Sequence, residues 1–367
     1  LMTNISPGDM NYEGLTKIAE KEKANFIDNR CNDLIRSKIL KKKGIHMEHS
    51  NLGILYKDKE GREKCNFNGD CLANPPYVFN ARYEIETLKK NVNFRYLPNH
   101  LIQSIEEKGN SYHITTRNLT DSEIKVYIAK TVFCSLGTLS TTKIVLGMLG
   151  KVEEKIPLLS TPAASFILFS FIKKRKGKTK LALSNANFTL IKNEEEVSGG
   201  LFPFPKDWWI NKYGGGYLSS WAFRILDNIL FSRILICSIN FSCKLSSNSL
   251  YLKKDQELRI FNENHSKALK ETYKKLIKKL SGAFRSESFF VIPFSPRLFS
   301  PGEDIHLGGT LPMGKSLPYP CDEEGNLRGM ENFYITDPSS MPFLAAKGHT
   351  FASMALSTLI VKKYCDS

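Results

Sequence analysis

The chain has 367 residues, of which 41% are apolar and 24% charged, with 24 Gly and 16 Pro. These fractions are typical of globular proteins and exclude a disordered, collagen-like or coiled-coil chain. The length predicts two domains, or one large domain with a second embedded in it. There are 52 Lys and Arg against 37 Asp and Glu, a net charge of +15. Because Lys, Asn and Ile are abundant throughout and the positive residues form no long uninterrupted patch, we interpret this charge mainly as compositional. The densest basic runs are at 41–43, 173–176 and 270–279.

The first half of the chain predicts short strands followed by a strand–turn–helix unit. Residues 13–43 show weak helical periodicity, and 84–90 are expected to be helical. Strand-like segments follow near 92–97, 100–107, 111–117 and 124–129, separated by turn signals. A buried strand is predicted at 131–135, then a Leu136-Gly137 turn and an apolar helix through Leu149. Strand, glycine turn and helix in this order form one half of a βαβ crossover, the unit of nucleotide-binding α/β folds.

The composition shifts near residue 151. Alternating stretches at 183–192, 233–241 and 249–261 predict a mostly antiparallel sheet, flanked by a helix at 264–282 for which Asn264 or His265 is the candidate N-cap. The aromatic cluster 202–209 either packs in a core or stacks on a substrate, and the core reading is slightly favoured. After residue 300 the sequence again predicts a strand followed by a helix. The buried strand is expected at 333–337 and the helix, which carries small residues on one face, at 350–364.

The cysteines and the apolar segments favour a cytoplasmic protein. No two of the eight cysteines form a CxxC pair or a zinc-finger spacing. No secretory signal precedes the first apolar segment, so Cys65 and Cys71 are expected to stay reduced rather than form a structural disulfide. No segment is long and apolar enough to predict a membrane span.

Two histidines are the candidate catalytic residues. His306 precedes Leu307-Gly308-Gly309-Thr310, and His349 follows Gly348, so each lies beside glycine at a boundary between a loop and an element. Imidazole titrates near neutral pH, and a pair converging on one pocket is suited to removing the proton of an alcohol. Taken alone, each histidine is more often a structural residue than a catalyst.

From His306 to Tyr364 the chain resembles the C-terminal signature of the glucose-methanol-choline (GMC) flavin oxidoreductases. The matching elements are His306, Gly309-Thr310, Met313-Gly314, the acidic stretch 322–325, Asp337, Pro342 and Gly348-His349. The segment from Asn91 to Leu146 is similar to the strand-rich segment of that family. The stretch 71–77, with its Cys and Pro residues, is a weaker similarity.

The resemblance implies an FAD-dependent oxidoreductase acting on the CH–OH group of a small-molecule alcohol or sugar. His306 would be the base that takes the hydroxyl proton as hydride leaves for the flavin, and His349 its partner at the same oxygen. Ile102 would contact the adenine through its backbone. Positions lining the ribityl chain, the pyrophosphate and the flavin ring would be Asp337, Pro338, Thr350 and Phe351.

The chain departs from the family in one respect: it contains no Gly-x-Gly-x-x-Gly, the motif that cradles the FAD pyrophosphate. The expected fold is therefore a mixed α/β (α+β) one, an incomplete Rossmann-like FAD-binding domain with an inserted antiparallel-sheet substrate domain. The FAD-binding domain is expected to comprise residues 1–150 and 301–367. The substrate domain is expected to comprise residues 151–300. The chain corresponds to the latter two-thirds of such an enzyme, so its partner would be a missing N-terminal FAD-binding segment.

Two other functional classes remain open at this point. One is a degenerate or accessory GMC-like protein that does not bind flavin. The other is a nucleic-acid-binding protein, which only the net charge suggests and which no recognisable motif supports. We therefore expect no nucleic-acid partner. The substrate, the electron acceptor and the oligomeric state are not indicated by the sequence.

Overall fold

The computed structural model describes residues 28–50, 55, 58, 61–63, 77–78, 80–172, 184–192, 195–204, 230–261, 265–303, 306–315 and 320–366. Several sequence predictions fall outside these residues: those on Cys65 and Cys71, on the loop 71–76, on 205–209 of the aromatic cluster and on the Asn264 cap.

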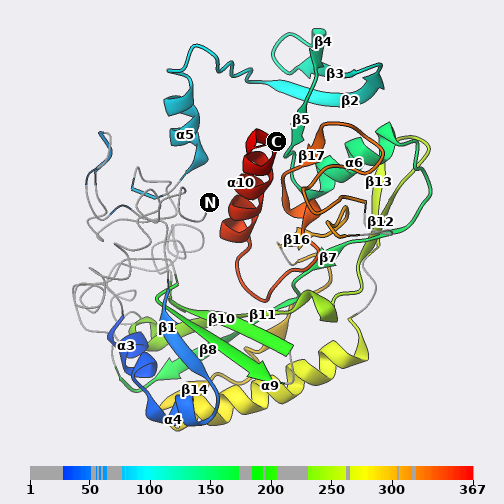
Figure 1. Ribbon diagram of the computed structural model, residues 1–367. Coiled ribbons are helices and arrows are strands. Elements are labelled where there is room, and N and C mark those ends of the chain that lie inside the picture. The colour runs from blue at the N-terminus through cyan, green and yellow to red at the C-terminus, as the bar shows by residue number, and fades with distance from the viewer. Residues whose placement is uncertain are drawn as a thin grey trace.

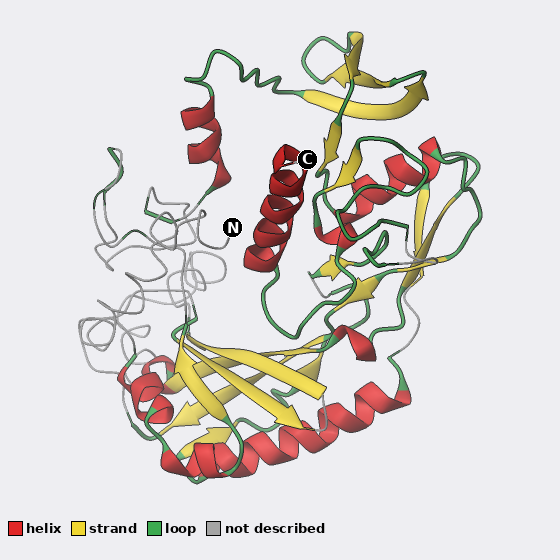
Figure 2. Ribbon diagram, in the orientation of Figure 1, coloured by secondary structure: helices red, strands yellow, loops and turns green. Residues whose placement is uncertain are grey.

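The larger sheet is antiparallel throughout (Figures 1 and 2). Its strands run in the order β1-β9-β10-β11-β8-β14, and β15 also pairs with β8. Their bounds are β1 His46–His49, β8 Ala163–Ser170, β9 Ala186–Lys192, β10 Glu195–Pro203, β11 Ile234–Phe241, β14 Phe289–Val291 and β15 Arg297–Leu298. The alternating stretches near 183–192 and 233–241 are thus confirmed as strands of one antiparallel sheet, in which β10 lies between them.

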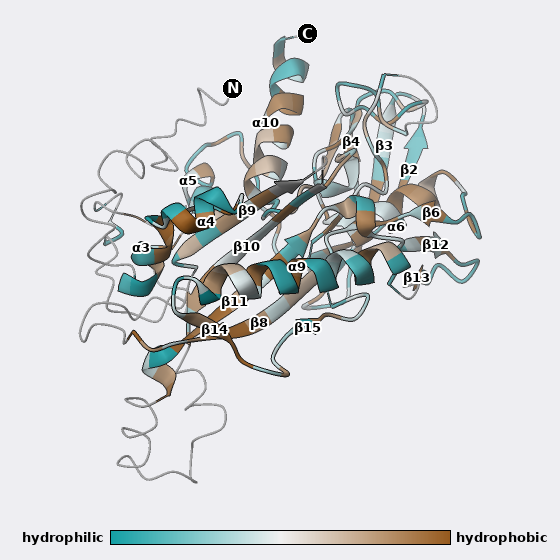
Figure 3. Ribbon diagram, turned by 90° about the horizontal axis from the view of Figure 1, so that it is seen from below, coloured by the Kyte–Doolittle hydropathy of each residue, from teal (hydrophilic) through white to brown (hydrophobic). Residues whose placement is uncertain are grey.

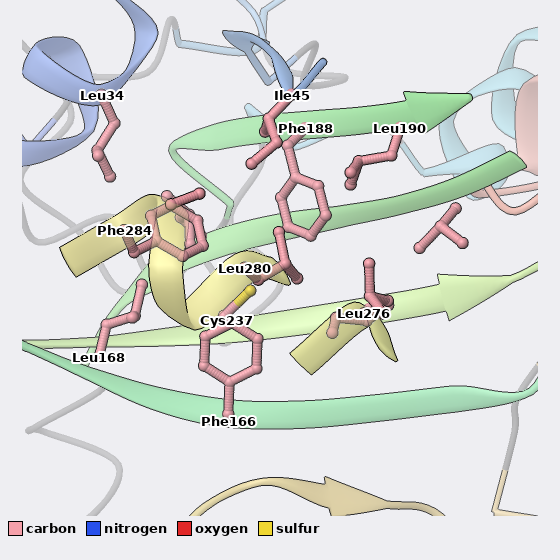
Figure 4. Packing of buried hydrophobic residues seen from close by; sticks show 14 of the residues in the cluster. Leu34, Ile45, Phe166, Leu168, Phe188, Leu190, Cys237, Leu276, Leu280 and Phe284 are labelled. Atoms are coloured by element: carbon pink, nitrogen blue, oxygen red, sulfur yellow. The ribbon is translucent and has the colours of Figure 1, made fainter. Parts of the chain in front are cut away.

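One face of this sheet is covered by helices. Along β8 every second residue is buried, as expected for a strand with one face in a core. Leu276, Leu280 and Phe284 of α9 (Lys267–Arg285) pack against these strand residues, among them Phe166 and Phe188 (Figure 4). Two short helices, α3 (Asn29–Ile35) and α4 (Lys38–Lys42), complete the same core with Leu34 and Leu40. Residues 29–49 therefore belong to the core of the large sheet.

Helix α9 begins at a different cap from the one expected. The side chain of Ser266 accepts a hydrogen bond from the Leu269 N–H and caps the helix. His265 instead contacts the Phe299 carbonyl through Nε2, at 2.5 Å. The prediction of His265 as the cap was wrong, because serine is a preferred N-cap residue and stands one position later.

The described chain has four smaller sheets, three of them antiparallel. The strands β2 (His100–Lys108), β3 (Ser111–Asn118) and β4 (Ile124–Ala129), which were predicted near these positions, pair as an antiparallel sheet. The hairpin β12 (Ser249–Leu252) and β13 (Leu258–Phe261) pairs with β6 (Ile156–Pro157) and not with the large sheet. β7 (Leu159–Ser160) pairs with β16 (Leu307–Gly308).

The strand expected near 92–97 is absent, and α5 (Ala81–Leu88) ends in turns instead. The side chain of Asn91 accepts the Asn93 N–H, and its carbonyl accepts the Phe94 N–H. These local bonds satisfy the backbone without a partner strand, which explains the error.

The predicted strand–turn–helix unit is confirmed. β5 (Val132–Cys134) leads through Gly137 into α6 (Thr138–Met148), and β17 (Phe333–Ile335) lies parallel to β5. A short helix, η5 (Pro338–Ser340), follows β17, and α10 (Thr350–Asp366) ends the described chain. Two further short helices are η3 (Phe231–Arg233) and η4 (Cys243–Leu245). The molecule is thus a mixed α/β protein with several antiparallel sheets and one parallel pair.

Among the described residues, no helix is long and apolar enough to cross a membrane, and no group of His, Cys, Asp and Glu could hold a metal ion. The six cysteines in the same part of the chain carry free thiols. Burial raises the pKa of Cys134 to about 11 and that of Cys321 to about 12, so these two thiols stay protonated near neutral pH.

Candidate functional site

His306 is held at the start of an extended segment that runs beside η5. The N–H groups of Gly309, Leu311 and Met313 donate to the carbonyls of Pro338, Ser339 and Ser340, at 2.8 to 2.9 Å. Every second residue of the 306–313 segment is therefore bound to consecutive residues after β17. The two halves of the sequence signature, around His306 and around Asp337, are joined by these bonds.

Thr161 contacts His306 twice. Its N–H donates to the His306 carbonyl at 3.3 Å, which extends the β7–β16 pairing by one residue. Its Oγ1 lies 3.3 Å from His306 Nδ1. Because Thr161 is almost fully buried, this hydroxyl holds the ring in a fixed orientation and leaves Nε2 as the ring nitrogen on the other side.

His349 lies at the end of a loop that is bound to the face of the large sheet opposite α9. Ser198 on β10 donates its hydroxyl to the Ala346 carbonyl, and Lys347 pairs with Glu196 at 3.4 Å. Leu344 is fully buried and is bound to Cys243 of η4 through its backbone. The sheet thus positions the loop, and α10 continues from it, since the Ser353 N–H donates to the His349 carbonyl at 2.8 Å.

The environment of His349 favours its neutral form. The side chain is 7% exposed, and burial lowers the pKa of its imidazole, while the Ala345 carbonyl opposes this shift. His349 Nε2 lies 2.9 Å from that carbonyl. A carbonyl only accepts, so Nε2 carries the proton and Nδ1 of the neutral ring is an acceptor.

The structure brings the two histidines together. Their ring centroids are 4.7 Å apart and the rings meet edge to face, at 81°. Two imidazoles at this separation can both reach one small polar group, and an imidazole with an unprotonated nitrogen can accept a proton from it. The two histidines come from segments on opposite sides of Asp337 in the sequence.

Asp337 has a clear role within the protein. Its Oδ2 accepts the Gly137 N–H at 2.9 Å and the Thr141 hydroxyl at 2.5 Å, and its Oδ1 accepts the N–H and the hydroxyl of Ser339. These four donors fill the acceptor sites of a carboxylate. Asp337 therefore caps η5 and ties the end of β17 to the start of α6.

The other predicted cofactor contacts are distributed over three elements. Pro338 opens η5, next to the His306 segment. Thr350 and Phe351 begin α10, are both exposed, and directly follow His349. Ile102 lies on β2 and packs on the cluster around Ile105, so the structure does not group it with the histidines.

The space beside His349 bears on whether a flat cofactor ring fits. A Cβ placed on Gly348 would meet no atom within 4 Å. The first intrahelical bond of α10 is made by Ser353, so the N–H groups of Thr350 and Ala352 have no acceptor within the helix. The open space at Gly348 and the backbone donors at the start of α10 fit the polar edge of a flavin ring.

The start of α6 is the other place where a dinucleotide could be expected to bind. This helix follows a strand and a glycine, and its start carries the partial positive charge that favours phosphate. Here the Asp337 carboxylate already takes the Gly137 N–H. The described residues therefore fit the ring of the cofactor, but they offer no cradle for its pyrophosphate.

Sequence reasoning missed Thr161 and Ala345, the two residues that hold the imidazoles. Thr161 is 145 positions from His306, and its surroundings in the sequence carry no signal of a polar contact. The Ala345 contribution is a backbone carbonyl, which any residue type supplies.

No family model and no curated protein matches the chain. A solved structure with a similar arrangement is the crystal structure of pyridoxine 4-oxidase from Mesorbium loti, with 12% sequence identity and a TM-score of 0.49. The match covers 73% of this chain and 57% of that one, little more than half of its length. At this identity and score, the likeness assigns no function.

Proposed function

We propose that this chain is an FAD-dependent oxidoreductase that acts on the CH–OH group of a small-molecule alcohol or sugar. The observation that supports it most is the edge-to-face pair of His306 and His349, with rings 4.7 Å apart. Oxidising a carbinol requires that its hydroxyl proton leave along with the hydride, and an imidazole pair can receive that proton. The resemblance of 306–364 to the GMC signature supplies the reaction class.

His306 is the base in this proposal. Thr161 engages Nδ1, so Nε2 is the atom that takes the hydroxyl proton. His349 holds the same oxygen. In the structure its Nε2–H donates to the Ala345 carbonyl, so an alcohol oxygen beside the two rings competes with that carbonyl for the one N–H of the neutral ring.

A bound flavin would supply the hydride acceptor. Thr350 and Phe351, at the start of α10 beside the open space at Gly348, would hold its ring. Asp337, Pro338 and Ile102 would line the rest of the cofactor, as the resemblance implies. In this scheme residues 301–367 and most of 1–150 form the cofactor-binding part. Residues 151–300 form the substrate-binding part together with residues 29–49, which pack in the core of the large sheet.

A second candidate is a GMC-like protein that binds no flavin. The observation that favours it is the lack of a pyrophosphate cradle: the chain has no Gly-x-Gly-x-x-Gly, and the start of α6 faces the Asp337 carboxylate. A nucleotide gains much of its binding free energy from such a cradle. Under the leading proposal, the chain alone therefore binds FAD weakly.

Titration of the chain with FAD, followed by flavin fluorescence, separates the two candidates. We expect saturable binding with a Kd above about 10 µM. Gly348→Leu fills the open space beside His349 and is expected to weaken binding at least about tenfold. Gly282→Leu is the matched control, because the Cβ position of Gly282 on α9 is equally open.

Each result of this titration has a definite meaning. Binding that Gly348→Leu weakens and Gly282→Leu does not supports the flavin site. The absence of any saturable binding supports the second candidate. Stoichiometric FAD that survives desalting would contradict weak binding and the role given to the missing cradle.

A further inference from the structure

Two basic runs that are far apart in the sequence meet on one face of the protein. All six lysines of α9 are exposed and lie on the side opposite its buried Leu276, Leu280 and Phe284. They are Lys267, Lys270, Lys274, Lys275, Lys278 and Lys279. With 3.6 residues per turn, they form a basic strip along a helix about 28 Å long, and one acidic residue, Glu271, is exposed on the same side.

Helix α4 adds a second basic strip beside the C-terminal half of α9 (Figure 3). Lys43 Nζ, at the end of α4, donates to the Gly282 carbonyl at 3.2 Å and to the Ser286 hydroxyl at 2.7 Å. Lys279 Nζ lies 3.9 Å from the position that a Cβ on Gly44 would occupy. Lys38, Lys41, Lys42 and Lys43 are all exposed. Together with the six α9 lysines they form what we call the α9–α4 face.

The lysines of this face outnumber its acidic residues in the described part of the chain, which are Glu271 on α9 and Glu287, bound to Ser37 beside α4. None of its lysines forms an ion pair there with Asp or Glu, whereas lysines elsewhere do, as in Lys253 with Asp255 and Glu257. Successive turns of a helix are about 5.4 Å apart, within the Debye length of about 8 Å at physiological salt. The potentials of neighbouring lysines therefore add.

Exposed apolar side chains border the same face. Ile39 lies between the lysines of α4 and is 43% exposed. At the C-terminal end of α9, Arg285 lies over the Phe290 ring, which meets Phe171 edge to face at 5.5 Å. Phe171 is 67% exposed and Ile172 is 40% exposed.

We infer that the α9–α4 face binds the surface of an anionic phospholipid membrane. The lysines complement the negative headgroups, and Ile39, Phe171 and Ile172 can enter the headgroup region, which favours apolar and aromatic groups. A nucleic acid would also attract the lysines, but its phosphate backbone makes no favourable contact with exposed Ile and Phe side chains. The inference is independent of the proposed oxidoreductase function, since no residue of the histidine site takes part.

Sedimentation with lipid vesicles tests this inference on the whole chain. Vesicles of phosphatidylcholine with phosphatidylserine are compared with vesicles of phosphatidylcholine alone. We expect binding only to the former, and binding that weakens as salt is raised. Replacing Lys270, Lys274 and Lys278 together by Gln is expected to weaken it about a hundredfold, at about fivefold per lysine.

The control removes the same charge elsewhere. Lys90→Gln, Lys130→Gln and Lys143→Gln together change exposed lysines outside the α9–α4 face, on the loops after α5 and β4 and on α6. This variant is expected to bind within about twofold of the original chain. Ile39→Asn with Phe171→Ser is expected to weaken vesicle binding while leaving binding to a DNA duplex unchanged.

Three results would overturn the inference. One is the absence of binding to the phosphatidylserine vesicles, whether or not a DNA duplex is bound. Another is an equal loss in the α9 variant and in the control, which would mean that only the net charge matters. The third is full binding by the α9 variant with an unchanged circular dichroism spectrum.

Discussion

The imidazole of His349 is nearly enclosed, and its chemistry depends on that enclosure. Burial lowers its pKa in the folded protein below the unfolded value of about 6.5. The unfolded chain therefore binds more protons than the folded one as the pH falls through this range, and linkage makes the folded state less stable there. We expect the free energy of unfolding to fall between about pH 7.5 and 5.5, and His349→Asn to reduce that fall.

The comparison requires denaturation curves at several pH values for both forms. Asn does not titrate, and its shorter amide stands in the place of Nδ1, so this variant also removes the Nε2 donor to the Ala345 carbonyl. His113→Asn removes an imidazole from β3 and controls for the loss of any histidine. An unchanged pH slope in His349→Asn would mean that His349 is not the titrating group behind it.

Asp337 is the residue that joins β17 to α6, and its replacement tests that role. In Asp337→Asn one oxygen becomes an NH₂ group, which meets donors from Gly137, Thr141 or Ser339 instead of accepting from them. We expect a loss of about 1–3 kcal/mol in the free energy of unfolding, measured by chemical denaturation. Asp33→Asn, at an exposed position of α3, is expected to change it by less than about 0.5 kcal/mol. Equal effects would remove the special role of Asp337.

At the scale of elements, the close packing of β9, β10 and β11 depends on a residue without a side chain. A Cβ on Gly199 would overlap with the Ser238 carbonyl oxygen and the Phe188 ring. Gly199→Ala is therefore expected to cost about 1–3 kcal/mol through overpacking. Gly282→Ala is expected to stabilise by about 0.5–1 kcal/mol, because it lies in α9 with open space around it. The melting temperature is expected to fall in Gly199→Ala and to rise in Gly282→Ala. A higher melting temperature in Gly199→Ala would contradict this packing.

Elements with a strong local signal could be predicted from the sequence. The alternation in 100–129 and 233–241 gave the correct strands, and the helices at 138–148, 267–285 and 350–366 were expected within a few residues. The strand expected near 92–97 does not form, because the side-chain hydrogen bond of Asn91 competes with strand pairing. The separation of β12 and β13 from the large sheet depends on partners distant in the sequence, which periodicity does not report.

The candidate site shows the same division. The motifs singled out His306 and His349, and the structure places their rings side by side, while their catalytic roles stay a prediction. Thr161 could not, because its contact with His306 is formed by the β7–β16 pairing, which involves only two residues on each strand. The meeting of the basic runs 41–43 and 270–279 was likewise hidden, because it results from the packing of α4 on α9.

At the scale of the whole molecule, two cores meet at the candidate site. The loop that carries His349 lies on the large antiparallel sheet, and the segment that carries His306 lies on η5, beside the β5–β17 pair. The distance between the imidazoles therefore depends on how these two parts pack. In our proposal, a proton is removed from an alcohol at this meeting point.

The most direct test is the anaerobic rate at which alcohols or sugars reduce FAD supplied in excess to the chain. His306→Ala is expected to slow flavin bleaching by ~10²–10⁴-fold, the usual contribution of a general base. His349→Asn should be much milder, because Asn still offers a hydrogen bond to the alcohol oxygen. A larger loss in His349→Asn than in His306→Ala would exchange the two roles. Bleaching by the original chain that neither substitution slows would contradict the account and return both histidines to a structural role.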